Sequence, residues 1–335
     1  MLCIKVKNID AELTKKYLVK QKLLDTRYKV YAKNSFIYFP VLSKPKVKPR
    51  NFRFGFEDIT FEPKGTRTDM VKRFIESHKE RAKSFDILGN IAIVDTEPEL
   101  VKKLAAAILK SNPNVMTVVR KGGAVSGVYR TRKYVYVAGK RDYTADYREN
   151  GCVFRFNINK TFFSTRLSYE RKRITDLSKN GENVVVMFAG VGPFAIEIAK
   201  KNPKSKIVAI ELNKFAHRYM LDNIRINKVK NVDPICADVA KVSKKYKNFA
   251  ERIVMPLPKD SASFMNHALK MAGKECTFHY YAFGPSGDPY KESMDMLEKI
   301  ARKNRRRFRV VFKRIVRPYS KNTVEIVLDF VMKRI

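Results

Sequence analysis

The sequence lacks any long apolar run. Among its 335 residues, no hydrophobic stretch approaches the roughly 20 residues that a membrane-spanning helix requires. Residues 1–7 contain no apolar segment of the kind that directs secretion. These absences argue against a helical membrane anchor, and we expect an intracellular, cytoplasmic chain.

Cysteine and histidine are scarce and scattered. The four cysteines stand at positions 3, 152, 236 and 276, so the sequence has no Cys-x-x-Cys pair for a metal or a redox centre. The four histidines are isolated as well. Unpaired thiols suit a reducing compartment. We therefore expect no metal site.

Acidic residues are few beside the basic ones. The chain has 70 Lys+Arg against 33 Asp+Glu, a formal net charge of +37. A preference for lysine in every segment accounts for part of the excess. The remaining positive charges would repel one another if no polyanion were bound. Binding to phosphate groups is the commonest function of such an excess of positive charge. We expect a nucleic-acid partner rather than a membrane surface, because no basic amphipathic helix stands apart from the folded segments.

The length predicts two or three domains. Residues 1–42 form a small unit in which short strands surround a helix at 11–24. A linker rich in proline and lysine follows at 43–50. Residues 51–175 mix strands and helices as an α+β domain. Residues 176–335 form the third domain.

The third domain has the pattern of a doubly wound α/β sheet. Apolar strands are expected at residues 184–187, 207–210, 233–236, 252–255 and 277–281. Between them, helices are expected at residues 194–200, 215–227 and 261–271. Strands that are apolar throughout are typical of a parallel sheet that is buried on both faces. Residues 309–315 and 324–331 are expected to close the sheet as an antiparallel pair.

The first strand of this domain leads into a glycine turn, Gly190-Val191-Gly192, and then into a helix. This geometry lays a ligand across the carboxyl edge of a sheet, where glycine lets the backbone come close. Glu211 ends the next strand, where a carboxylate can hold ribose hydroxyls. Asp238 ends the third strand, within reach of an adenine amino group. The order along the chain is the one that a bound nucleoside requires.

Two other interpretations compete with a nucleoside site. In the first, Glu211 and Asp238 are ordinary acids at strand ends. The glycine turn and the two acids follow three successive strands, however, which argues against coincidence. A dinucleotide is the second alternative, because Ala195 completes an allowed variant of the Gly-x-Gly-x-x-Gly fingerprint. The intervening Pro193-Phe194 and the Pro256-Leu-Pro258 segment at the fourth strand end argue against it.

Three segments resemble one family of enzymes. Met187-Phe-Ala-Gly-Val-Gly-Pro-Phe194 is similar to the cofactor motif of the archaeal and eukaryotic tRNA (guanine-N1)-methyltransferases that act at position 37. Phe163-Ser-Thr-Arg-Leu-Ser-Tyr-Glu-Arg171 resembles the catalytic segment of that family. A third match is Tyr129-Arg-Thr-Arg132, which resembles its substrate-arginine segment. The resemblance extends over nearly the whole chain and is weakest over residues 1–80.

The resemblance implies a class I methyltransferase fold, S-adenosylmethionine as cofactor and N1 of guanosine 37 in tRNA as the methyl acceptor. Pro256 departs from the family's usual asparagine, and Val186 stands where an aspartate is common. The proline variant resembles an archaeal subgroup linked to wyosine biosynthesis. Members of that subgroup also methylate C7 of 4-demethylwyosine to isowyosine. Both activities are therefore expected in this one chain.

The resemblance also implies roles for single residues. Glu170 would take the proton from guanine N1, and Arg130 would stabilise charge on guanine O6. Without the resemblance, Glu170 is a salt-bridge residue at a helix start and Arg130 a phosphate contact. The substrate contacts would be Arg132, Tyr169 and Pro258. The cofactor contacts would be Arg171, Phe188, Ala189, Gly190, Val191, Gly192, Glu211, Leu212, Asp238, Val239 and Pro256.

Aromatic side chains near these segments could stack on an extruded base. The candidates are Tyr129, Phe162, Phe163 and Tyr169. For Phe162 and Phe163, core packing is the preferred interpretation. The basic run at residues 302–309 is either a phosphate-binding segment or a solvated loop.

The expected partner is tRNA, bound at the anticodon loop and, through residues 1–42, at the elbow, by a monomeric chain. Two alternatives remain open. A non-catalytic basic RNA-binding protein would have no need of the glycine turn and its two acids. A methyltransferase that acts on another RNA or on an amino group is the other alternative. Amino methylation is typically marked by an Asp/Asn-Pro-Pro-Tyr motif, where this chain has Met255-Pro-Leu-Pro258.

Overall fold

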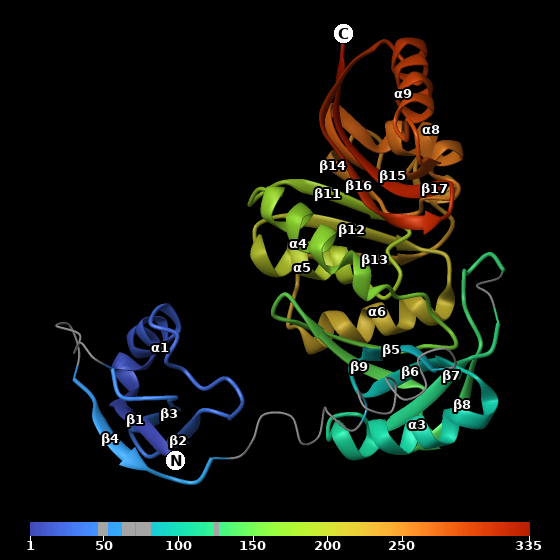
Figure 1. Cartoon of the computed structure of the whole chain (residues 1–335). Helices are drawn as coiled ribbons and strands as arrows, with labels where there is room; N and C mark the ends of the chain where they lie inside the picture. The colour runs from blue at the N-terminus through green and yellow to red at the C-terminus, as the bar shows by residue number, and fades with distance from the viewer. Residues whose placement is uncertain (46–52, 62–70, 72–81, 124–126) are drawn as a thin grey trace. The chain divides into compact units, whose positions relative to one another are not determined.

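The computed structural model describes residues 1–45, 53–61, 71, 82–123 and 127–335. Internal contacts divide the chain into two units (Figure 1). The first comprises Met1–Glu80 and Lys110–Asn112, and the second comprises Arg81–Leu109 and Pro113–Ile335. No helix of the described residues is long and apolar enough to cross a membrane.

The described part of the first unit contains an antiparallel sheet in the order β2-β3-β1-β4, with helix α1 packed against it. Its elements are β1 (Leu2–Lys7), the 3₁₀ turn η1 (Asn8–Asp10), α1 (Ala11–Lys20), β2 (Tyr31–Lys33), β3 (Phe36–Pro40) and β4 (Gly55–Asp58). Ile4, Val6, Leu18 and Phe39 form the core between sheet and helix.

The boundary expected at residue 42 needs correction. Because β4 pairs with β1, with Ile4 opposite Phe56, the first unit continues at least to Asp58. The proline-rich segment at 43–50 therefore connects two strands of one sheet and does not separate two domains. Residues 46–52 of that region lie outside the described residues.

The second unit begins with a four-stranded sheet in the order β5-β6-β7-β8. Its elements are β5 (Ala82–Leu88), β6 (Ile91–Thr96), α3 (Pro98–Ser111), β7 (Thr117–Lys121) and β8 (Tyr134–Gly139). Helix α3 connects the parallel strands β6 and β7, as a crossover between parallel strands requires.

A hairpin of β9 (Thr144–Glu149) and β10 (Cys152–Asn157) follows and packs on α6 (Lys214–Ile226). Two asparagine side chains of this region hold the hairpin. Asn223 bonds both backbone groups of Arg155, and Asn227 those of Val153. Each amide therefore satisfies a donor and an acceptor on the strand.

The expected boundary between residues 175 and 176 also needs correction, since it falls inside helix α4 (Ser168–Leu177). A short 3₁₀ turn, η2 (Thr165–Leu167), leads into this helix. Leu167 and Ile174 pack into one core cluster with Phe194 and Ile198 of α5 (Pro193–Lys201). Residues 168–177 thus pack in the same layer as α5.

The centre of the second unit is a seven-stranded sheet in the order β13-β12-β11-β14-β15-β17-β16. Its strands are β11 (Asn183–Met187), β12 (Lys206–Glu211), β13 (Val232–Cys236), β14 (Ala250–Met255), β15 (Ala272–Pro285), β16 (Arg306–Ser320) and β17 (Thr323–Arg334). The first five are parallel, and β17 pairs antiparallel with both β15 and β16. The doubly wound α/β fold and its closing antiparallel pair are confirmed.

Helices cover both faces of this sheet (Figure 1). Val184 and Val186 face α4, α5 and α6, whereas Val185 and Met187 face the other side. That side is covered by α7 (Val239–Val242), α8 (Ser261–Met271) and α9 (Lys291–Lys303). The alternation explains why the strand is apolar throughout.

The basic run at 302–309 is neither a loop nor wholly exposed. It spans the end of α9 and the start of β16. The Arg306 guanidinium is buried and donates to the carbonyl oxygens of Ala272 and Gly273. Arg302 pairs with Glu298 on the surface of α9. Part of the run is therefore structural.

Candidate active site

The strands of the parallel sheet end level with one another at its carboxyl edge. Met187 is paired with Ile210, and Val186 with Val254, so β11, β12 and β14 finish in one row. The strand order reverses between β11 and β14, which makes this point the topological switch of the sheet. Ligands of such sheets bind in the crevice outside the switch point.

Gly190 lies in the turn that leaves β11 at this switch point. Its φ of +59° is in the left-handed region. A Cβ added there would meet no atom closer than 3.9 Å, the carbonyl oxygen of Phe162. The space above Gly190 is therefore open on the side where a ligand would lie, as expected for a backbone that a nucleoside approaches.

Gly192 has a different role from the one expected. Its φ is +89°, and a Cβ would lie 2.9 Å from Cγ of Met220 and 3.0 Å from Cδ1 of Ile196. Met220 belongs to α6, so this glycine allows α6 to pack closely against the start of α5. Its small size serves helix packing, whereas the cofactor contact implied by the resemblance stays a prediction.

Glu211 is tied directly to the glycine turn. Its Oε2 accepts a hydrogen bond of 2.7 Å from the backbone amide of Gly190, and its Oε1 accepts one of 2.7 Å from Asn213. Burial raises the pKa of the Glu211 carboxyl, and the backbone amides that donate to it act in the opposite direction. A half-buried carboxylate at the switch point fits the hydroxyl pair of a ribose.

Asp238 follows the end of β13 and caps helix α7. Its Oδ1 accepts a hydrogen bond of 2.8 Å from the amide of Ala240. The backbone amide of Ala237 donates to the carbonyl oxygen of Glu211 at 3.0 Å, which holds the ends of β12 and β13 together. Gly190, Glu211 and Asp238 are thus brought to one edge, and the donor set fits an adenosyl group.

Arg130 is connected to the glycine turn through Phe162. The carbonyl oxygen of Phe162 is the nearest atom to the open side of Gly190, and the Arg130 guanidinium is 5.6 Å from the Phe162 ring. Asn159 fixes this arrangement, because its side chain bonds both backbone groups of Tyr134, near the end of the arginine segment. The Phe162 backbone therefore borders the open side of Gly190, and the Phe162 ring contacts Arg130.

The preferred interpretation of core packing is wrong for Phe162 and holds for Phe163. The Phe162 side chain is 40% exposed. Phe163 stacks on Phe156 at 4.6 Å and lies under the Arg171 guanidinium at 4.9 Å. Phe162 is the residue of the pair that is available to a base.

Glu170 is buried beneath the same edge on the α4 face of the sheet. Its Oε2 accepts hydrogen bonds from the Tyr281 hydroxyl at 2.9 Å and from Arg173 at 2.9 Å and 3.1 Å. Tyr281 follows Tyr280, which pairs with Met255 in the last row of β14. Glu170 is therefore a buried residue and no surface salt-bridge residue.

Arg171 points away from its neighbour, into a buried ion cluster. Its guanidinium binds both oxygens of Glu149, at 2.5 Å and 2.8 Å, and lies 3.8 Å from Glu197. It also donates to the carbonyl oxygen of Ser164. These contacts join α4 to β9 and α5, whereas the cofactor contact implied by the resemblance stays a prediction.

The other expected contact residues differ in their exposure. Leu212 and Tyr169 are exposed, whereas Ala189, Val191 and Val239 are buried. Phe188, Arg132, Pro256 and Pro258 are half-buried. Phe188 contacts Phe264 of α8, ring to ring at 4.8 Å.

Sequence reasoning missed Asn213. This buried residue caps α6 through Phe215, donates its side-chain amide to the carbonyl oxygen of Lys160, and donates its backbone amide to Glu211. It therefore links the cofactor edge to the segment that carries Phe162. An asparagine just before a helical pattern is a recognised N-cap signal, which could have identified it.

The partners of Glu170 were missed as well. Tyr281 and Arg314 are 111 and 144 residues away from it. No spacing rule connects such positions. The described residues contain no group of three or more His, Cys, Asp or Glu side chains that could hold a metal ion.

Family models match three parts of the chain. Residues 145–311 match the TRM5/TYW2 methyltransferase domain. Residues 3–48 match the tRNA methyltransferase 5 N-terminal domain, and residues 69–142 the TYW2 N-terminal domain.

Curated relatives and solved structures agree with these models. The tRNA (guanine(37)-N(1))-methyltransferase Trm5b of Pyrococcus abyssi is 35% identical over 98% of both chains, and its crystal structure superposes with a TM-score of 0.72 over 99% of both. A complex of aTrm5 with tRNALeu has 28% identity and a TM-score of 0.69 over 99% of both chains. The tRNA (guanine(37)-N(1))/4-demethylwyosine(37)-methyltransferase Taw22 of Nanoarchaeum equitans is 40% identical over 46% of this chain and 52% of its own. The chain therefore belongs to the TRM5/TYW2 family of methyltransferases.

Proposed function

We propose that this protein transfers a methyl group from S-adenosylmethionine to N1 of guanosine 37 in tRNA. The observation that carries the proposal is the convergence of Gly190, Glu211, Phe162 and Arg130 at the switch point of the sheet. The similarity to a tRNA (guanine(37)-N(1))-methyltransferase over 98% of the chain supports the choice of substrate.

The residues at the carboxyl edge would hold the cofactor. Glu211 would bind the ribose hydroxyls, Asp238 would face the adenine amino group, and the open side of Gly190 would admit the amino-acid portion. S-adenosylmethionine, when bound, supplies a methyl group made electrophilic by its sulfonium. The protein has then to position the base and to move one proton.

Glu170 and Arg130 would carry the chemistry on the base. Guanine N1 bears a proton near neutral pH, and Glu170 would accept it as the methyl group arrives. Such a general base is worth about 10²–10⁴-fold in rate. Arg130 would stabilise the charge that moves onto guanine O6. The exposed ring of Phe162 would support the extruded base.

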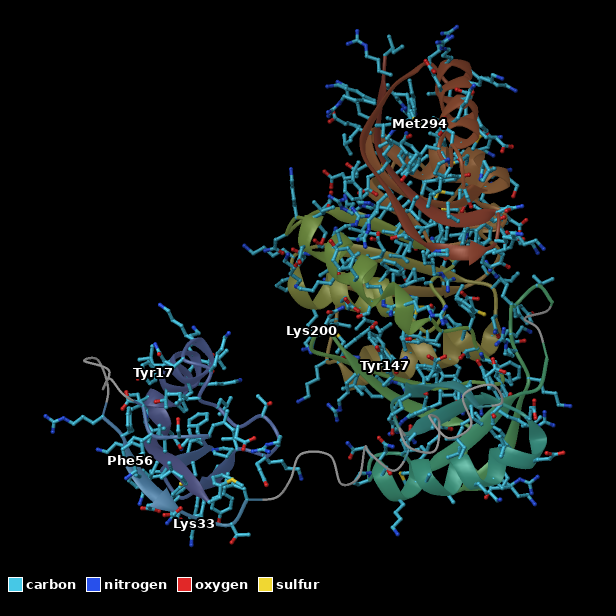
Figure 2. All side chains as sticks on the ribbon, in the orientation of Figure 1. Tyr17, Lys33, Phe56, Tyr147, Lys200 and Met294 are labelled. Carbon is cyan, nitrogen blue, oxygen red and sulfur yellow. The ribbon has the colours of Figure 1, made fainter. Side chains whose placement is uncertain are left out.

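The rest of the chain would bind the RNA. Nitrogen-tipped side chains project from the outer surface of the second unit, in keeping with the net charge of +37 (Figure 2). The first unit would contact the tRNA elbow, and one chain would suffice for activity. Gel filtration of the protein with one equivalent of tRNA tests the stoichiometry, and deletion of the first unit tests the elbow contact.

A methyl-transfer assay tests the activity. We expect labelled methyl to pass to an unmodified tRNA with guanosine 37 and to be lost when adenosine replaces that guanosine. Glu170→Gln should keep cofactor affinity and lower the single-turnover rate by about 10²-fold or more. Cofactor affinity serves as the control for folding. A variant with the rate of the wild type would refute the role of Glu170.

One residue and one relative support a second product. Pro256 stands where the family usually has asparagine, and the chain is 40% identical over 155 residues to a relative named for both reactions. We propose that C7 of 4-demethylwyosine is methylated in the same pocket. A tRNA that carries 4-demethylwyosine should accept labelled methyl, and Pro256→Asn should reduce this activity more than the activity on guanosine. No transfer to that tRNA would leave the single activity on guanosine, and equal losses would show that Pro256 does not select the product.

Two other outcomes would replace the proposal. If calorimetry detects no binding of S-adenosylmethionine, the protein is a basic RNA-binding protein without catalysis. If the cofactor binds but methyl passes only to another RNA, the enzyme belongs to a different pathway of RNA modification.

A further inference from the structure

The two carboxylate oxygens of Glu170 have unequal surroundings. Oε2 accepts three hydrogen bonds, one from Tyr281 and two from Arg173, at 2.9–3.1 Å. Oε1 has a single partner in the described part of the chain, Nη1 of Arg314, at the longer distance of 3.3 Å. A carboxylate oxygen has room for about two such bonds. Oε1 is therefore the oxygen with remaining capacity to accept a proton.

Arg173 is not free to leave Glu170. It also binds Asp329 at 2.5 Å, and Asp329 accepts from His279 at 2.7 Å. His279 in turn lies 2.6 Å from Arg252. Removing Arg173 from this buried chain would leave a carboxylate without its cation, which is costly. Oε2 is thus permanently occupied.

Arg314 is held much less firmly. It lies on β16, the edge strand of the sheet, and pairs with Val327, the residue that also pairs with Tyr281 on the other side. Its side chain is 39% exposed, and that of Glu170 is 2% exposed. The Arg314 guanidinium lies 4.2 Å from the ring of Tyr169, a residue that is 61% exposed. Arg314 therefore covers Oε1 and faces solvent at the same time.

We infer that Arg314 is a positioning residue that covers Oε1 of Glu170 until RNA binds, and that a backbone phosphate of the tRNA then takes its guanidinium. This inference rests on the proposed function. A phosphate competes well for arginine because it offers the same paired acceptor oxygens as a carboxylate. The exchange removes the one partner of Oε1 among the described residues and frees this oxygen to accept a proton.

The exchange completes the proton balance of the reaction. As guanine N1 bonds to the methyl carbon, the carbon–sulfur bond breaks and its electron pair stays on sulfur. The N1 proton passes to Oε1. With Arg314 in place, that oxygen faces a cation and not the base. The protein would therefore keep its proton acceptor covered in the absence of substrate.

The test separates RNA binding from chemistry. Arg314→Ala should weaken tRNA binding. The slope of log affinity against log salt concentration should become less steep by about one unit, which corresponds to one lost phosphate contact. Its single-turnover rate at saturating tRNA should match the wild type, since the bound RNA has already removed Arg314 from Glu170. Arg314→Lys should restore the salt slope.

Lys321→Ala is the control for this effect and should leave the salt slope unchanged. Lys321 lies in the turn that follows the same strand, is exposed and has no carboxylate partner among the described residues. Thermal unfolding and cofactor affinity should be those of the wild type in all three variants. A rate at saturation that falls with Arg314→Ala would mean that Arg314 orients Glu170 throughout and would overturn the inference. An unchanged salt slope would overturn it too.

The proposed function fails separately from this inference. If the wild type transfers no methyl to tRNA with guanosine 37, or if Glu170→Gln reacts at the full rate, the proposed activity or its base is wrong before Arg314 is tested. If both hold and only the Arg314 result differs, the exchange alone is wrong.

Discussion

The backbone amide of Gly190 donates a 2.7 Å hydrogen bond to Oε2 of Glu211. This bond joins the turn after β11 to the end of the neighbouring strand β12, next to the switch point of the sheet. The carboxylate is thereby fixed beside the open face of the turn, with Asn213 holding its second oxygen. A preformed acceptor of this kind loses little side-chain entropy when a ribose binds.

Glu211→Gln should therefore weaken the binding of S-adenosylmethionine. A hydrogen bond to a charged group is worth about 1.5–3 kcal/mol, which corresponds to roughly a 10- to 100-fold loss of affinity. Calorimetry on the full chain measures it. Glu275→Gln, which removes an exposed partner of Lys333, is the control and should leave affinity unchanged.

The affinity should also depend on pH in a defined direction. Because burial raises the pKa of Glu211, this carboxyl takes up a proton at a pH where exposed glutamates are still ionised. The ribose contact requires the ionised form. Acidification should thus weaken cofactor binding by the wild type but not by Glu211→Gln, and parallel pH dependences would contradict the assignment.

Gly192→Ala should lower stability and not act primarily on the cofactor. The left-handed backbone costs a non-glycine residue about 1–2 kcal/mol, and overpacking against Met220 and Ile196 costs about 1–3 kcal/mol more. Urea unfolding measures the loss. Gly287→Ala is the control, because its Cβ would meet no atom within 4 Å. Equal stability of the two variants would contradict the packing argument.

The sheet and its ligand edge could be predicted because they depend on local patterns. Apolar runs such as residues 184–187 identify buried parallel strands, and their order places the glycine turn at the switch point. The helix at 291–303 was not predicted, although Leu297 and Ala301 bury its apolar face. The buried residues Ser293, Leu297 and Ala301 recur every four residues, so the helical period is present in the sequence and could have identified this helix.

The charge pairs could not be predicted. Glu170, Arg171 and Arg173 lie within four residues on one helix, yet they join separate networks around Asp329 and Glu149. Tertiary packing decides which of the 70 basic side chains pair with which of the 33 acidic ones. Family resemblance pointed to Glu170, but it gave no information about what surrounds it.

Phe162→Ala should impair the docking of the target base. Stacking on an aromatic ring is worth about 1–3 kcal/mol per base, so kcat/KM should fall roughly 5- to 100-fold, and Phe162→Tyr should retain activity. Phe163→Ala is the informative contrast. Its ring stacks on Phe156 in the core, so that variant should lose about 3–5 kcal/mol of stability. The reverse pattern would contradict the assignment of the two rings.

Glu197→Gln should remove a pH dependence of stability. Burial, together with the charge of Glu149, raises the pKa of Glu197 from 4.5 to about 8 in the folded chain. Ionisation of this carboxyl therefore opposes folding, and its effect on the free energy of unfolding grows as the pH rises from about 4.5 to about 8.

The glutamine variant should have nearly the wild-type stability at pH 5 and a higher stability at pH 9. Asn150, which donates to Glu197 at 2.9 Å, can still bond the glutamine carbonyl. Urea unfolding at the two pH values measures the difference, with the exposed Glu298→Gln as control. Because Arg171 needs one ionised carboxylate and has it in Glu149, neutralising Glu197 leaves that pair intact. A variant that is less stable than the wild type at pH 9 would show that Arg171 requires both charges.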